Sequence, residues 1–165
     1  MKEIDQTTFG FPGGNCFSAC VASLLELNIE DVPYFMGEEN WFEEFKKWLR
    51  PRGYWAICVP LNNNNWEPEG LCILSGKSPR GDFDHSVVAN RLEMIHDPHP
   101  SRDGIESKVD VIALIPIEPT FYETQYNKLF SFLVKNYSDF IKKTSWPSEA
   151  PAEIAIRLLE KTNVP

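Results

Sequence analysis

Apolar residues recur at helical spacing in the first third of the chain. After the turn-rich segment Phe9–Asn15, such a stripe predicts a helix with Asn15 as its N-cap. A second stripe predicts a helix from about Glu38 to Leu49, which Pro51 stops because proline cannot continue the helical hydrogen bonds. The stripes consist of Phe17, Cys20, Val21, Leu24 and Leu25, and of Trp41, Phe42, Phe45, Trp48 and Leu49.

The middle of the chain consists of short runs of β-branched and aromatic residues, which favour strands. Five strands are predicted, at Tyr54–Val59, Leu71–Leu74, His85–Ala89, Leu92–His96 and Val109–Ile117. Gly76–Asp84 is predicted to be a mobile loop whose place before His85 suits the lip of a cleft. The asparagine run Asn62–Asn65 is expected to form an exposed loop.

Beyond Pro119 the apolar pattern becomes helical again, and Ser148 is placed to cap a last helix. The order is therefore helices, then an antiparallel sheet, then helices, which is typical of an α+β protein rather than alternating β-α-β units. We expect a single domain with its core in residues 1–118 and a C-terminal helical segment, 119–165, packed on that core.

Composition and charge narrow the class of protein. The chain has 165 residues, of which 42% are hydrophobic, so it can bury a core and is not expected to be disordered. It has no apolar run of membrane-spanning length and no secretory signal pattern at its start, so a cytoplasmic location is expected. The formal net charge of −8 makes nucleic acid and anionic membranes poor partners, while neutral or cationic substrates are easier to admit. The oligomeric state is left open.

The four cysteines are interpreted as free thiols, because a small disulfide scaffold would contain more of them. Cys16 and Cys20 are not followed by a second pair at zinc spacing, so neither a metal nor another cofactor is expected. Cys20, Cys58 and Cys72 lie in apolar stripes or strands and are predicted to belong to the core.

Cys16 follows Gly13, Gly14 and Asn15 at the first turn of a predicted helix. The unpaired N–H groups and the dipole of a helix N-terminus stabilise a thiolate. The glycines would let a substrate backbone approach closely. The alternative is that Cys16 is a small buried residue that merely begins a helix.

A nucleophilic cysteine needs an imidazole as its general base. The chain has three histidines, His85, His96 and His99. His85 opens a predicted strand and Asp97 follows the next one, where a carboxylate would orient the imidazole. The two would lie directly opposite if the loop centres on Arg91 and spans Asn90–Leu92, whereas a two-residue loop would place them on opposite faces. His96 would then project to the face opposite Asp97, whereas with another register His96 could itself be the base.

Gly14-Asn15-Cys16-Phe17 resembles the papain-type motif Gly-Ser-Cys-Trp. The order and spacing of cysteine, histidine and aspartate are similar to those of bacterial double-glycine leader peptidases, whose His-x-Val-Val strand and Asp-Pro match His85–Val88 and Asp97-Pro98. The resemblance covers roughly residues 4–118. It implies a papain-like fold with Cys16, His85 and Asp97 as a catalytic triad and with Gln6 as the oxyanion-hole glutamine. A plain surface glutamine is the alternative for Gln6.

The resemblance implies a cysteine-dependent hydrolase that cleaves a peptide or other amide bond through a thioester acyl-enzyme. Gly14, Asn15, Asp84 and His99 are candidates for substrate contact, with Arg102 near His99 in the same loop. The alternative for His99 and Arg102 is that they are simply exposed loop residues. The same machinery serves amidases, deamidases and acyl transferases, and a non-catalytic module that binds a peptide or a metabolite on this fold also remains open.

Overall fold

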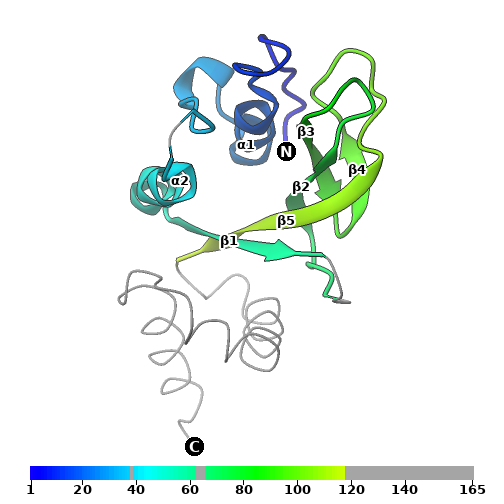
Figure 1. Ribbon diagram of the computed structural model, residues 1–165. Helices are drawn as coiled ribbons and strands as arrows, with labels where there is room; N and C mark the ends of the chain where they lie inside the picture. The colour runs from blue at the N-terminus through cyan, green and yellow to red at the C-terminus, as the bar shows by residue number, and fades with distance from the viewer. Residues whose placement is uncertain (38, 62–65, 118–165) are drawn as a thin grey trace, which may run out of the picture. The chain divides into compact units, whose positions relative to one another are not determined.

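The computed structural model describes residues 1–37, 39–61 and 66–117 (Figure 1), which belong to one compact unit. Two helices precede a five-stranded antiparallel sheet, so the predicted α+β class is confirmed. The elements are α1 (Cys16–Leu25), η1 (Ile29–Asp31), α2 (Trp41–Leu49), η2 (Arg50–Arg52), β1 (Tyr54–Pro60), β2 (Leu71–Lys77), β3 (Asp84–Asn90), β4 (Glu93–His96) and β5 (Ser107–Pro116). The asparagine loop and the C-terminal helical segment predicted above lie outside the described residues.

The first helix begins directly after Asn15, as predicted, but the Asn15 side chain has another role than capping. The backbone carbonyl of Asn15 accepts the first helical hydrogen bond, from Ala19 N–H at 3.0 Å, but the Asn15 side chain makes no cap bond. Its Oδ1 atom instead accepts the backbone N–H groups of Thr7 and Thr8, each at 3.0 Å. The predicted N-cap position of Asn15 is therefore confirmed, but its side chain ties the N-terminal segment to the start of the helix and does not cap the helix N–H groups.

The second helix begins at Trp41, later than the predicted start near Glu38. Asn40 lies outside the helix, with φ −103° and ψ 34°, and its carbonyl accepts the N–H groups of Glu43 and Glu44. The predicted end at Leu49 is confirmed. None of the helices in the described part of the chain is long and apolar enough to cross a membrane.

Aromatic side chains join the two helices. Phe17 of α1 and Phe45 of α2 meet edge to face with ring centroids 5.0 Å apart, and Phe35 of the connecting segment lies 5.2 Å from Phe45. All three are buried. The predicted aromatic stripe of α2 therefore packs in the core, and it fixes α2 against the helix that begins at Cys16.

The sheet has the strand order β1-β5-β2-β3-β4. Both helices cover the same side of it (Figure 1), α1 against β3 and β2, and α2 against β1. Ile73, Val88 and Ile112 face this layer and are completely or almost completely buried. The core thus lies between one sheet face and two helices, and the N-terminus of α1 lies near the sheet strand that carries His85.

The β3–β4 hairpin does not have the predicted register. Asn90 pairs with Glu93, so the turn contains two residues, Arg91 and Leu92, and not the three predicted. Arg91 takes a left-handed conformation, with φ 58°, which suits such a tight turn.

A β-bulge follows this turn. The register shifts between the pairs Ala89–Met94 and Val88–His96, which leaves Ile95 without a partner on β3. One extra residue on one strand reverses the alternation of all side chains beyond it. The bulge therefore changes which residues after β4 share a face with the beginning of β3.

The predicted loop at Gly76–Asp84 is shorter than expected, because Gly76 and Lys77 extend β2 and Asp84 begins β3. A Cβ atom on Gly76 would lie 1.6 Å from the carbonyl oxygen of Ser107, so the close passage of β5 requires glycine there. The remaining loop is closed by a hydrogen bond from Ser78 N–H to the Phe83 carbonyl at 2.9 Å.

Candidate active site

The thiol of Cys16 and the imidazole of His85 form a hydrogen-bonded pair between the N-terminus of α1 and the start of β3. The backbone groups of Ser86 and Phe17 also hydrogen-bond the sulfur. Burial by itself would raise the pKa of the thiol, but these hydrogen bonds and the charge of His85 outweigh it and lower the pKa. This is the environment that favours a thiolate.

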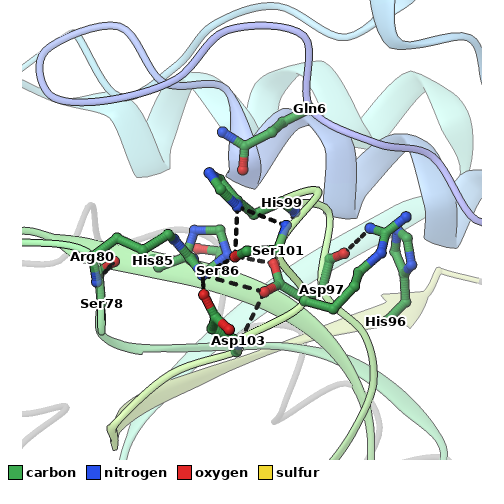
Figure 2. A network of polar contacts seen from close by, with 12 residues as sticks. Gln6, Ser78, Arg80, His85, Ser86, His96, Asp97, His99, Ser101 and Asp103 are labelled. Atoms are coloured by element: carbon green, nitrogen blue, oxygen red, sulfur yellow. Dashed lines mark hydrogen bonds and ion pairs between the residues drawn. The ribbon is translucent and has the colours of Figure 1, made fainter.

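The second ring nitrogen of His85 contacts a carboxylate. His85 Nε2 lies 2.7 Å from Asp97 Oδ1 (Figure 2), and both side chains are buried. Burial lowers the pKa of His85, while its hydrogen bonds to Asp97 and Cys16 raise it, with a net increase. Since Nε2 is engaged with Asp97, Nδ1 is the nitrogen left for the thiol.

Asp97 is held ionised from several directions. The backbone N–H of His99 donates to Oδ1 and that of Gly104 donates to Oδ2, both at 2.8 Å. Burial would raise the pKa of Asp97, but the hydrogen bonds from His85 and from these two amides lower it to about 2. The carboxylate therefore orients His85 and stabilises its charged form over the whole neutral range.

Arg80 is a further member of this site that the sequence did not indicate. Its Nη1 atom lies 3.6 Å from Asp97 Oδ2, donates to Ser101 Oγ at 3.1 Å, and lies 3.7 Å from Asp103 Oδ2 (Figure 2). Nη2 is buried without a hydrogen-bond partner in the described residues. Arg80 ties the loop before His85 to the loop after Asp97, so the predicted mobile loop is anchored at the site.

Gln6 is buried, with 6% of its surface exposed, so the alternative of a plain surface glutamine is wrong. Its backbone N–H donates to the Pro98 carbonyl at 3.0 Å, which places it beside the loop that follows Asp97. Nε2 donates to the Thr8 carbonyl at 2.8 Å, and Oε1 is buried without a partner in the described part of the chain. No described hydrogen bond joins Gln6 to Cys16, so its oxyanion role stays a prediction.

Gly14 and Asn15 both shape the loop that leads to Cys16. The N–H of Gly14 donates to the Gly10 carbonyl at 2.8 Å, and a Cβ atom on Gly14 would lie 2.5 Å from that oxygen. Asn15 Nδ2 donates to Thr7 Oγ1, in addition to the two bonds that Oδ1 accepts. The loop itself explains both residue types, and their contact with a substrate stays a prediction.

The remaining substrate candidates lie around His85. The ring of His99 meets that of His85 edge-on, with centroids 6.3 Å apart, and meets Phe9 in the same way at 5.3 Å. Arg102 donates to the backbone carbonyl of Asp97 and forms an ion pair with Asp5. His99 therefore adjoins the site, whereas Arg102 holds the backbone of Asp97 and links it to Asp5.

Asp84 is exposed at the first position of β3, opposite Lys77. His96 is buried, and its Nε2 lies 3.0 Å from the Ile4 carbonyl and 3.6 Å from Asp5. His96 thus holds the N-terminal segment and does not contact Cys16, which is consistent with its expected place on the face opposite Asp97.

The four cysteines are all free. Burial raises the pKa of the Cys20 thiol, and it raises the pKa of Cys58 and of Cys72 to about 12. Cys20 and Cys72 are completely buried, while Cys58 packs against the core from a half-buried position. Their predicted core location is confirmed for Cys20 and Cys72, whereas Cys58 lies at the margin of the core. Cys16 differs from all three in having a lowered thiol pKa.

One depression of the described surface lies apart from these residues. A depression beside α2 is lined in part by Tyr34, Glu44 and Trp48, and none of the candidate catalytic residues lines it. Within the described ranges, no group of three or more His, Cys, Asp or Glu side chains is arranged to hold a metal ion.

Comparison with known proteins leaves the site to be interpreted from its own geometry. No family model, no curated protein and no solved structure matches this chain. What the site can do chemically therefore follows from the hydrogen-bonded series Cys16, His85 and Asp97, in which a thiol of lowered pKa contacts an imidazole that a carboxylate orients.

Proposed function

We propose that this protein is a cysteine-dependent hydrolase that cleaves a peptide or other amide bond through a thioester. The observation that carries the proposal is that the Cys16 thiol, whose pKa is lowered by its interaction with His85, adjoins an imidazole whose Nε2 lies 2.7 Å from Asp97 Oδ1. A thiol, an imidazole and a buried carboxylate in this order form the arrangement that activates a nucleophile and later protonates a leaving group.

The proposed reaction has two steps. The Cys16 thiolate attacks the carbonyl carbon, and His85 gives its proton to the amine as the C–N bond breaks, which leaves a thioester. His85, now neutral, takes a proton from water as the water attacks this thioester, and the acid is released with the thiolate restored. The Cys16 backbone N–H and the Gln6 amide would stabilise the oxyanion.

We further propose that the fold is papain-like. In support, the candidate nucleophile begins a helix that packs on an antiparallel sheet, and the histidine lies at the start of a strand of that sheet. The carboxylate comes from the segment directly after the next strand. This arrangement of elements suits the order of motifs noted in the sequence.

The first test is the pH dependence of Cys16 alkylation by iodoacetamide, followed by peptide mass spectrometry. An ordinary thiol has a pKa of about 8.5. We expect the pH midpoint of Cys16 alkylation to lie below that value in the wild type and to rise in His85→Ala. Cys58, whose pKa is raised to about 12, is the internal control within the same digest. A Cys16 midpoint near the ordinary value, unchanged by His85→Ala, would overturn the proposal.

A screen of peptide and amide substrates then tests the reaction itself. Cys16→Ala should lower the turnover rate by roughly a thousandfold or more, because in the proposed reaction this thiol is the nucleophile. Products formed with and without an added amine separate hydrolysis from acyl transfer. If Cys16→Ala keeps the full function of the wild type, the result would favour the alternative of a non-catalytic binding module.

A further inference from the structure

A row of polar side chains crosses the sheet next to the candidate nucleophile. Ser75 on β2 lies directly opposite Ser86 on β3 and opposite Asp110 on β5. Directly opposite residues project from the same face of a sheet. That face is the one that the helices cover, since the residues two positions away on the same strands belong to the core. They are Ile73, Val88 and Ile112.

The side chains of this row interact with one another, and the backbone of its last member, Ser86, contacts the Cys16 sulfur. The hydroxyl oxygens of Ser75 and Ser86 are 3.1 Å apart, and Ser75 also hydrogen-bonds the Asp110 carboxylate. The backbone of Ser86 hydrogen-bonds the Cys16 sulfur. Neighbouring strands are about 4.8 Å apart, so Asp110 lies roughly 10 Å from the part of β3 that contacts the sulfur.

Asp110 has no positive partner in the described part of the chain. It is half-buried, and no lysine, arginine or histidine among the described residues forms an ion pair with it. Burial raises the pKa of Asp110, and the nearby charge of Asp84 also raises it. Removing a carboxylate from water without a cation is unfavourable, and a bound ammonium or guanidinium group would offset that penalty.

We propose that Asp110 forms a subsite for a positively charged group of the substrate, so that the enzyme acts on amides with an ammonium or guanidinium group roughly 10 Å from the scissile carbonyl. The Ser75 and Ser86 hydroxyls lie between this carboxylate and the part of β3 whose backbone contacts Cys16. The inference rests on the proposed function, because it assigns the substrate class of that same site. The net charge of −8 acts in the same direction.

The test uses methanethiosulfonate reagents of similar size, one with a trimethylammonium group and one with a sulfonate. The ratio of their rates at Cys16, measured by peptide mass spectrometry at pH 8 and low salt, reports the local charge independently of the thiolate fraction. We expect Asp110→Asn to lower the cationic-to-anionic ratio by roughly threefold or more, because an unscreened charge at about this distance acts on both reagents. Glu30→Gln, in the exposed part of η1, is the control with the same change of net charge.

An unchanged ratio in Asp110→Asn, or an equal decrease in Glu30→Gln, would overturn the subsite. Circular dichroism checks that each variant is folded. Should Asp110→Asn fail to fold, the wild type decides the matter through peptide amides that carry lysine, norleucine or glutamate at one scanned position. Preferred cleavage of the lysine peptide supports the subsite, whereas equal cleavage of all three overturns it and leaves the hydrolase standing. A Cys16 thiol with an ordinary pKa would instead remove the hydrolase itself.

Discussion

His85 and Asp97 are in contact across the β3–β4 hairpin although they are not partners in its register. Their side chains meet at 2.7 Å between Nε2 and Oδ1. The two-residue turn, with Asn90 opposite Glu93, would by itself place them on opposite faces of the sheet. The unpaired residue Ile95 reverses the alternation of the side chains that follow it, so that both side chains come to the same face.

Deletion of Ile95 should therefore separate the imidazole from the carboxylate. Without the extra residue, the chain beyond Met94 shifts by one position and Asp97 turns to the other face. We expect the low-pH alkylation of Cys16 to be lost and the His85 imidazole to titrate closer to its ordinary value, measured by NMR. Ile95→Ala keeps the bulge and should leave both properties intact, since Ile95 is exposed to 43% and does not belong to the core. Retention of the low-pH thiolate in the deletion variant would contradict this account.

Acid should weaken the fold through Asp97. Its pKa is lowered to about 2 in the folded state, against about 3.9 in an unfolded chain, so its ionised form stabilises the fold above pH 4. That contribution, on the order of 2 kcal/mol, is lost as the pH falls from about 4 toward 2. Urea unfolding at a series of pH values measures it, and the difference between wild type and Asp97→Asn isolates it from other carboxyl groups. Parallel curves for the two proteins over this range would rule it out.

Arg80 should matter as a cation and not as a bulky side chain. Its guanidinium lies near the carboxylates of Asp97 and Asp103 and is mostly buried. Arg80→Met preserves most of the apolar contact but leaves Asp97 without this charge, so we expect the free energy of unfolding at pH 7 to fall by about 1–3 kcal/mol. The loss should shrink toward pH 2, where Asp97 becomes protonated. Chemical denaturation at both pH values is the measurement, and an equal loss at both would refute the electrostatic role.

Asn15 offers a test of what begins the first helix. If its side chain acted as an N-cap, Asn15→Ser would preserve stability, because serine caps helices about as well as asparagine. The side chain instead binds Thr7 and Thr8, which serine is too short to reach in the same way. We expect Asn15→Ser and Asn15→Ala to lower the free energy of unfolding equally, by about 1–2 kcal/mol. Full stability of the serine variant would restore the capping interpretation.

The sequence by itself determined the elements and the chemistry-bearing residues. The apolar stripes placed both helices, and all five predicted strands are present with shifted ends. These features depend on neighbours a few positions apart, so they can be read from a local pattern. Cys16 was selected by the same local reasoning, whereas His85 and Asp97 were selected because the chain has only three histidines and because the motifs around them resemble a known family.

Tertiary structure alone decided how these residues meet. The bulge at Ile95, the ion pair of Arg80 with Asp97 and the row of side chains from Ser86 to Asp110 all join segments that are distant along the chain or on different strands. Such contacts depend on strand register and loop closure, which a one-residue change reverses without any visible change in the apolar pattern. For that physical reason the sequence indicated that His85 and Asp97 are partners but predicted the wrong turn length and register for the hairpin. Only the folded sheet brings the Asp97 carboxylate within hydrogen-bonding distance of the His85 imidazole.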